Sequence, residues 1–189
     1  MANIDLNTGI NGIRGHINGW VYRRVNGQTI LAPMPAPSSK PASPSQIAQR
    51  ESFANAASWA RSVLADILTR PIYAAVSLEQ KKPIFSVAIG DFFNPPRITF
   101  INPAAYHGHV GEKIKVLATD DVEVMSVRVA LRETSGALIE QGNAVKSGED
   151  WLYTATTLVA LGHPIKIEAT AVDRPGNTGT RDLPHTVTA

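Results

Sequence analysis

The spacing of hydrophobic positions changes near residue 97. From there to residue 189, apolar residues recur at every second position in seven short runs separated by turn residues. This period is typical of strands with one buried face, and seven such strands predict an all-β immunoglobulin-like sandwich. Trp151, beside Tyr153, is the expected core aromatic residue. The expected strands are 97–102, 112–119, 123–133, 137–145, 150–157, 164–172 and 179–187.

Before residue 97, apolar residues recur at helical spacing through much of 45–96. The first helix is expected to begin with a capping box formed by Ser43, Pro44 and Gln46, and to run through Thr69. Its apolar face is expected to contain Ile47, Phe53, Ala57, Ala60, Leu64, Ile67 and Leu68.

Two shorter helices are expected after this one. Pro71 and Pro83 each suit the first turn of a helix, where a missing N–H costs nothing, so we expect helices over 71–80 and 83–92. The run IFSVAIG, residues 84–90, also allows a strand, and the pattern alone does not decide between the two.

The N-terminal region contains three Asn-Gly pairs, Asn11-Gly12, Asn18-Gly19 and Asn26-Gly27, and the last two are separated by a strand-like run. Asn-Gly favours a type I′ hairpin turn, because both central residues of that turn need a positive φ. We therefore expect a three-stranded meander with strands at 13–17, 20–25 and 28–32. A sheet of this size is marginal by itself and needs something to pack against.

The segment from Pro33 to Pro44 contains five prolines, both end residues included, so it is expected to form an extended, stiff arm or linker. The predicted fold is an α+β N-terminal region, a short β-meander plus helices, followed by an immunoglobulin-like sandwich. The expected parts are a lead and meander over 1–32, the arm over 33–44, a helical region over 45–96 that completes the N-terminal domain, and the sandwich over 97–189.

Composition narrows the classes of function. The chain has no Cys, which excludes disulfides, thiolate metal sites and cysteine nucleophiles. Residues 1–96 hold nine Lys and Arg against five Asp and Glu, whereas residues 97–189 hold nine against eleven. This polarity is weaker than the basic stripe of a dedicated nucleic-acid binder. Without a Sec-type leader or a membrane-spanning run in the sequence, we expect a cytoplasmic, virion-associated or non-Sec-exported protein.

Two stretches of the second half resemble bacterial Ig-like modules of surface and repeat proteins. They read ATDD at 118–121 and AVDRPGN at 171–177. The resemblance covers 97–189, implies the sandwich fold and gives no ligand. The first half resembles an uncharacterised small-protein family of environmental and Bacteroidetes-type bacteria, which brings no function. Its motifs are G-x-V-Y-R-x-x-N-G at 19–27, Q-x-A-Q-R at 46–50 and D-F-x-x-P-P at 91–96.

Carboxylates offer the first candidate chemistry. Asp120, Asp121 and Asp173 are expected at one end of the sandwich, where their oxygens would suit Ca²⁺. The competing interpretation is that Asp120 and Asp173 accept hydrogen bonds from backbone N–H groups in tight turns. His107 and His109 share a short motif but lack a third ligand, so we expect them in a solvated loop. The capping interpretation is favoured, and we expect neither a bound metal nor a cofactor.

Catalytic signatures are missing from the sequence. No G-x-S-x-G, P-loop, H-E-x-x-H or G-x-G-x-x-G motif occurs, so we expect a protein that is not an enzyme. Arg23 and Arg24 lie next to each other on an expected strand, where they would suit phosphate contacts. Alternate strand residues point to opposite faces, which favours an exposed edge instead.

The expected function is that of a self-assembling structural subunit, of filament, surface or virion-shell type, which displays an Ig-like domain. Strand addition or arm exchange between copies would satisfy the open edges of the meander. One alternative is a monomeric binding or adhesion module for glycan or protein, using loops 103–111, 119–123 and 173–179. A further alternative is a nucleic-acid-associated protein. The expected interface contains Trp20, Tyr22, Arg23, Arg24, Pro33, Pro35 and Pro37.

Overall fold

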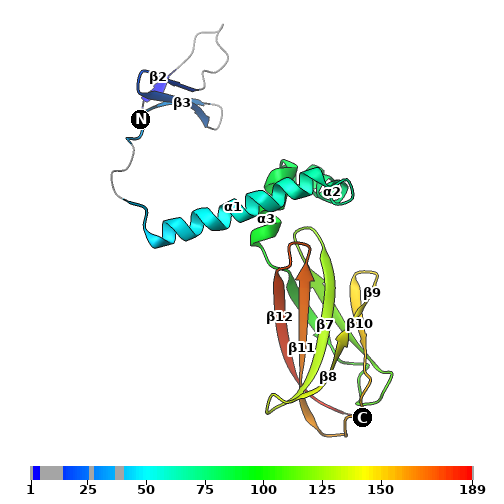
Figure 1. The fold of residues 1–189 in the computed structure, drawn as a ribbon. Helices are drawn as coiled ribbons and strands as arrows, with labels where there is room; N and C mark the ends of the chain where they lie inside the picture. The colour runs from blue at the N-terminus through cyan, green and yellow to red at the C-terminus, as the bar shows by residue number, and fades with distance from the viewer. Residues whose placement is uncertain (1, 5–14, 26–27, 37–40, 189) are drawn as a thin grey trace. The chain divides into compact units, whose positions relative to one another are not determined.

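The computed structural model describes residues 2–4, 15–25, 28–36 and 41–188 (Figure 1). Its contacts divide the chain into two compact units, Met1–Ile47 and Ala48–Ala189. We expected residues 45–96 to complete the N-terminal domain. Instead, the contacts group the helices after Ile47 with the sandwich. The helices are α1 (Pro44–Ala65), α2 (Arg70–Gln80) and α3 (Ile84–Phe93).

The first unit contains a four-stranded antiparallel sheet in the order β1-β4-β3-β2. The three strands of the expected meander are confirmed, and a fourth strand, which the sequence did not reveal, pairs with β4. Asn18 and Gly19 have φ values of 48° and 79°, which confirms the type I′ turn. Asn26-Gly27 lies outside the described residues. The strands are β1 (Ala2–Ile4), β2 (Gly15–Ile17), β3 (Trp20–Val25) and β4 (Gln28–Pro33).

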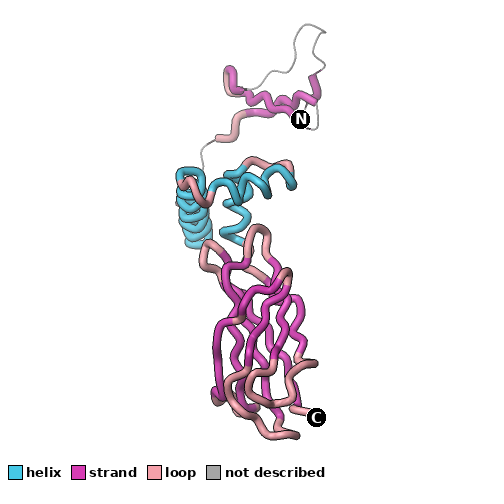
Figure 2. The backbone as a smooth tube through the Cα atoms, turned by 90° about the vertical axis from the view of Figure 1, so that its right-hand side faces the viewer, coloured by secondary structure: helices cyan, strands magenta, loops and turns pink. Residues whose placement is uncertain are grey.

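The second unit contains two antiparallel sheets that face each other (Figure 2). Their strand orders are β5-β6-β10-β9 and β12-β11-β7-β8. These orders correspond to the A-B-E-D and G-F-C sheets of an immunoglobulin-like domain, with β8 added beside strand C. The strands are β5 (Arg97–Asn102), β6 (Lys113–Thr119), β7 (Val124–Glu133), β8 (Leu138–Asn143), β9 (Val145–Ser147), β10 (Asp150–Thr154), β11 (Pro164–Asp173) and β12 (Thr178–Thr186).

One expected strand proves to be two. The run 137–145 breaks at Ala144, where the chain leaves one sheet as β8 and enters the other as β9. Ala144 is buried, and its N–H donates to the carbonyl of Val127, so the crossing point itself is anchored on β7. An alternating pattern cannot reveal such a crossing, because both strands keep the same period.

The sandwich core lies between the two sheets. Trp151 and Tyr153 of β10 are buried in it, as expected. On β7, Val127, Val129 and Leu131 are buried at alternate positions, but this alternation fails at the start of the strand. The register shows Val124 opposite Asp173 and Ser126 opposite Val172, so Met125 is an extra residue in a β-bulge. Met125 is therefore exposed, whereas Val124 turns inward.

The capping box of α1 is confirmed: the Ser43 N–H donates to Gln46 Oε1 at 3.0 Å, and the Gln46 N–H donates to Ser43 Oγ at 3.3 Å. The expected end of this helix at Thr69 is wrong. The Asp66 carboxylate accepts hydrogen bonds from the N–H groups of Leu68 and Thr69, which turns the chain after Ala65. A hydrogen bond from the Thr69 hydroxyl, together with these two backbone bonds, lowers the pKa of Asp66.

The buried face of α1 also differs from the expected one. Ile67 and Leu68 are exposed in the turn after the helix, and Phe53 is half exposed on the helix itself. The helix instead packs through small residues. A second, smaller core joins α1, α2 and α3, and Val122 of the sandwich packs against it. The helical reading of 84–90 is confirmed, and the strand alternative is wrong. None of the described helices is long and apolar enough to cross a membrane. The buried residues of α1 are Ala56, Ala57, Ala60 and Val63.

Candidate functional site

Polar side chains gather where α3 meets one end of the sandwich. The Asn177 side chain, in the turn between β11 and β12, donates to the backbone carbonyls of Asp91 and Phe92 at 3.3 and 3.2 Å. Asn94, just after α3, donates through its side chain to Asp121 at 2.6 Å. These bonds attach the end of α3 to the two loops at this pole of the sandwich, which we call the helix-facing pole.

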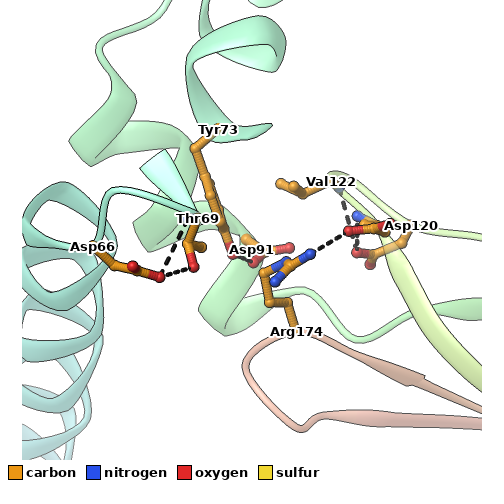
Figure 3. Close-up of polar contacts among 8 residues, drawn as sticks. Asp66, Thr69, Tyr73, Asp91, Asp120, Val122 and Arg174 are labelled. Carbon is orange, nitrogen blue, oxygen red and sulfur yellow. Dashed lines mark hydrogen bonds and ion pairs between the residues drawn. The ribbon is translucent and has the colours of Figure 1, made fainter. Parts of the chain in front are cut away.

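Asp91 is the most deeply buried carboxyl group of this region, with an exposed fraction of 0%. It lies on α3 on the same buried face as Val87 and Ala88. Its Oδ2 accepts a hydrogen bond from the hydroxyl of Tyr73, which reaches it from α2 (Figure 3). Within the described residues, its other oxygen, Oδ1, has no hydrogen-bond partner.

Burial is the main cause that raises the pKa of Asp91 to about 7. The hydrogen bond from Tyr73 acts in the opposite direction, whereas the neighbouring carboxyl groups of Asp120 and Asp173 raise the pKa further. Burial and the hydrogen bond to Asp91 also raise the pKa of the Tyr73 hydroxyl. Asp91 therefore holds its proton at a pH at which an exposed aspartate has lost it.

Two of the predicted carboxylates, Asp120 and Asp173, hold tight turns in shape. Asp120 Oδ2 accepts from the N–H groups of Val122 and Glu123 at 3.3 and 3.0 Å. Asp173 Oδ1 accepts in the same way from two N–H groups in the β11–β12 turn, at 2.8 and 2.6 Å. Burial raises the pKa of Asp120 although its backbone hydrogen bonds act to lower it. Both residues thus accept hydrogen bonds from backbone N–H groups in tight turns, as the capping interpretation predicts.

Arg174, next to Asp173 in the chain, brings a positive charge to this pole. Its Nη2 donates to Glu123 at 2.5 Å, and this pair ties the β11–β12 turn to the loop between β6 and β7. Its Nε is buried and has no partner in the described part of the chain. The guanidinium charge also acts on Tyr73 and Asp66, whose pKa values it tends to lower.

The third calcium candidate, Asp121, makes a different contact from the other two. Asp121 faces Asn94, whereas Asp120 and Asp173 both lie close enough to Asp91 to act on its charge. Among the described residues, no group of three or more His, Asp or Glu side chains is arranged to hold a metal ion. The histidines His107 and His109 lie in the loop between β5 and β6. The His107 ring contacts Glu112 at 3.2 Å, and the backbone N–H groups of both histidines donate to that same carboxylate.

The three loops that we expected to form one binding surface lie at two ends of the sandwich. Loop 103–111 precedes β6 and loop 119–123 follows it, so β6 separates them. Loops 119–123 and 173–179 are both at the helix-facing pole, where their side chains bond to α3 and to each other. Loop 103–111 is at the opposite end, which we call the free pole.

The expected interface residues of the N-terminal sheet are mostly exposed. Trp20 has an exposed fraction of 46%, and Arg23, Pro33 and Pro35 are exposed as well. Tyr22 is half-buried. The side chain of Arg24 and the whole of Pro37 lie outside the described residues.

Sequence reasoning missed Asp91 as a member of this cluster. The residue stands three and four positions after Ala88 and Val87, which places an ionisable group on the apolar stripe of a helix. That spacing was the available signal. Its partners, Tyr73, Asp120 and Asp173, come from three other segments, and only the folded chain brings them together.

Comparisons with known proteins add little to this geometry. No family model matches the chain, and no curated protein matches it. The crystal structure of CopC from Methylosinus trichosporium OB3b aligns with a TM-score of 0.37 and 15% identity, over 49% of this chain and 93% of that one.

Two further solved structures align with the same part of the chain at similar strength. A tetra-tandem repeat from the extending region of a large adhesion protein gives a TM-score of 0.37 and 17% identity, over 50% of this chain and 24% of that one. A bromine derivative of BhCBM56 aligns with a TM-score of 0.32 and 15% identity, over 46% of this chain and 86% of that one. Because all three TM-scores lie below 0.5, these similarities carry no argument about function.

Proposed function

We propose that this protein is a non-enzymatic structural subunit that assembles through its N-terminal sheet and displays the sandwich. One observation supports the proposal above others: the N-terminal sheet buries almost none of its described side chains. Among the side chains described between residues 15 and 36, only that of Thr29 is buried. Trp20 and Met34 are 46% and 54% exposed.

A single sheet needs a second layer to become stable, because one face of its strands must leave water. The strands β1 and β2 form the two edges of this sheet, and each is only three residues long. An open edge can accept a strand from another copy, which satisfies its backbone groups. Assembly between copies thus supplies both the missing layer and partners for the edges.

The test is sedimentation velocity of the full chain over a wide range of concentration. We expect the wild type to associate and the variant Trp20→Glu to sediment as a monomer, because a buried, unpaired charge opposes the contact. Phe100→Glu is the matched control, since Phe100 is a similarly exposed aromatic residue, 53%, on β5 of the sandwich. A wild type that stays monomeric throughout contradicts the proposal, and so does a Phe100→Glu variant that dissociates to the same degree.

A binding module is the second candidate, and the free pole of the sandwich favours it. Val110, Leu158 and Leu161 are 62%, 67% and 66% exposed there. They lie on two loops joined by backbone hydrogen bonds from Val159 to Gly108 and from Gly111 to Ala155, both of 2.8 Å. Exposed apolar residues that gather on neighbouring loops are typical of contact surfaces.

The test of this second function is binding to a glycan array and to a panel of cell-surface proteins. We expect the double variant Leu158→Ser, Leu161→Ser to lose binding that the wild type shows. Leu78→Ser is the control, because Leu78 is 81% exposed on α2, away from the free pole. Equal loss in the control contradicts a site at this pole.

A further inference from the structure

Three buried polar atoms of the sandwich have no hydrogen-bond partner among the described residues. They are the hydroxyl oxygens of Tyr106 and Tyr153 and Oε1 of Glu140. The three residues that carry them are 1%, 2% and 7% exposed, so bulk water does not reach these atoms. Buried polar groups in native proteins are nearly always hydrogen-bonded, either to protein or to ordered water, so these three atoms need an explanation.

Glu140 faces the core of the sandwich although it is an acidic residue. It stands opposite Leu131 in the β7–β8 pair, and opposed residues of an antiparallel pair share one face of the sheet. Leu131 is fully buried in the core, so Glu140 lies on the core face as well. Its Oε2 accepts hydrogen bonds from the backbone N–H and the hydroxyl of Thr156, at 2.8 and 2.5 Å. Oε1 is the oxygen that still needs a donor.

Tyr153 approaches this carboxylate from the facing sheet. Gly142 stands opposite the buried Val129, so it lies on the core face of β8, two residues after Glu140. A Cβ at Gly142 would lie 3.0 Å from Cε2 of Tyr153 and 3.8 Å from the hydroxyl oxygen of that residue. The glycine thus lets the Tyr153 ring lie against β8. Two residues of a strand span about 7 Å, which brings the hydroxyl close to the Glu140 side chain.

Tyr106 brings a second hydroxyl from loop 103–111 at the free pole. Its ring is part of the same core and lies 6.1 Å, centroid to centroid, from the ring of His185, whose buried Nε2 also has no partner in the described part of the chain. Burial, and after it the charge of Glu140, raises the pKa of Tyr106 and of Tyr153 to about 12. Because charge interactions weaken with distance, Glu140 acts on both rings from nearby. Both hydroxyls keep their protons at neutral pH and can donate.

We propose that water bound inside the sandwich, beneath the free pole, bridges Glu140 to the hydroxyl groups of Tyr153 and Tyr106. A water molecule can donate to Oε1 of Glu140 and accept from a tyrosine hydroxyl, so it satisfies a buried acceptor and a buried donor together. Internal waters typically make about three hydrogen bonds, and this region offers three unpartnered atoms from three separate segments. The bound water thereby connects β8 of one sheet with β10 of the other.

This polar bridge also supports the surface of the free pole. Thr156, which holds the other oxygen of Glu140, begins the segment that carries the exposed residues Leu158 and Leu161. Between these two residues, the N–H of Val159 donates to a carbonyl of the loop that contains Tyr106. The water therefore lies under both loops of this pole. The inference does not depend on what the pole binds.

The test is the ¹⁷O magnetic relaxation dispersion of water in solutions of the full chain. This measurement counts water molecules that stay in the protein longer than it tumbles, and it is not affected by exchanging hydroxyl protons. We expect the double variant Tyr106→Phe, Tyr153→Phe to hold at least one such water fewer than the wild type, because Glu140 alone offers too few partners. The control is Tyr22→Phe, which alters a half-buried tyrosine of the N-terminal sheet and should leave the number unchanged.

The melting temperature provides a second readout, and its sign discriminates. If the two hydroxyls had no partner at all, their removal would relieve a cost of burial and raise the melting temperature. If water bridges them to Glu140, the double variant instead leaves Oε1 of Glu140 without a donor. We then expect the melting temperature to fall by on the order of 5 °C.

A crystal structure of the wild type decides the matter if the double variant fails to fold. We expect electron density for water within hydrogen-bond distance of Glu140 Oε1 and of the Tyr153 hydroxyl. A direct hydrogen bond between these two groups, with no water between them, would overturn the proposal. So would a cation at this place, recognised by several oxygen ligands at about 2.3–2.6 Å. An unchanged number of long-lived waters, or a raised melting temperature, in a folded double variant would overturn it as well.

Discussion

The N-terminal sheet and the C-terminal sandwich are both built from antiparallel strands, yet of the two only the sandwich closes a core of its own among the residues that the structure describes. Each part contains a tryptophan on a strand, and the contrast between the two residues is direct. Trp151 is 7% exposed between two sheets, whereas Trp20 is 46% exposed on a single sheet. Alternation along a strand thus provides an apolar face, but a second layer is what removes that face from water.

The largest effect that separates the two parts should come from removing these rings. Trp151→Ala should lower the free energy of unfolding by about 3–5 kcal/mol, because it leaves a cavity in the sandwich. Trp20→Ala should change it by less than about 1 kcal/mol. Urea denaturation followed by far-ultraviolet circular dichroism measures both. A similar cost at the two sites would show that the N-terminal sheet has a closed core after all.

A glycine in the sandwich provides the next test. A Cβ at Gly179 of β12 would lie 1.7 Å from the carbonyl oxygen of Pro96, just before β5, so the backbone must move. We expect Gly179→Ala to destabilise the protein by about 1–3 kcal/mol. Gly90→Ala is the matched control, since nothing lies within 4 Å of its added Cβ and it stands in α3. Thermal unfolding by calorimetry would compare them. Equal stability of the two variants would contradict the close approach of β12 to Pro96.

A glycine-to-alanine substitution in the N-terminal sheet should also destabilise its surroundings, but for a different reason. Gly19 has no neighbour within 4 Å of an added Cβ, but its φ is 79°. Gly19→Ala should therefore cost about 1 kcal/mol through backbone strain alone. This cost should appear as faster amide exchange in β2 and β3, with the melting of the sandwich unchanged. A lower melting temperature of the sandwich would show that the two units depend on each other.

The smallest expected effect concerns the start of α1. Ser43→Ala removes the hydroxyl that accepts the Gln46 N–H, which should weaken the first helical turn by about 0.5–2 kcal/mol. Residues 44–51 are exposed, so the loss should stay local. We expect faster amide exchange in this turn and no change in the unfolding of the second unit. Protection unchanged from the wild type would contradict a stabilising capping box.

Most of the secondary structure was predictable, because prolines, Asn-Gly pairs and the spacing of hydrophobic residues determine the conformation of the residues next to them in the sequence. The features that escaped prediction depend on contacts distant in sequence. The bulge at Met125 is set by pairing with β11, and the break at Ala144 by the change of sheet. β1 was missed because three residues give too short a pattern, and its existence rests on pairing with β4.

The candidate site was predictable in part. The capping bonds of Asp120 and Asp173 were predictable, because aspartate side chains in turns commonly accept hydrogen bonds from nearby backbone N–H groups. The partners of Asp91 did not follow, because Tyr73 is 18 residues away along the chain and Asp120 belongs to the sandwich. The end of α1 shows the same limit on a smaller scale. A helical pattern of apolar residues continued to Leu68, and one carboxylate, Asp66, stopped the helix.

The hydrogen bonds of Asn177 restrict the order in which the chain can fold while it is being synthesised. The last carbonyls of α3 receive their donor from a side chain 85 and 86 residues further along the chain. A nascent chain that has only just exposed α3 therefore cannot complete this helix end, because Asn177 has not yet been synthesised. Translation proceeds at about 5–20 residues per second, so these two carbonyls wait for several seconds without their donor. The final hairpin, β11 and β12, then docks the helices as it completes the sandwich.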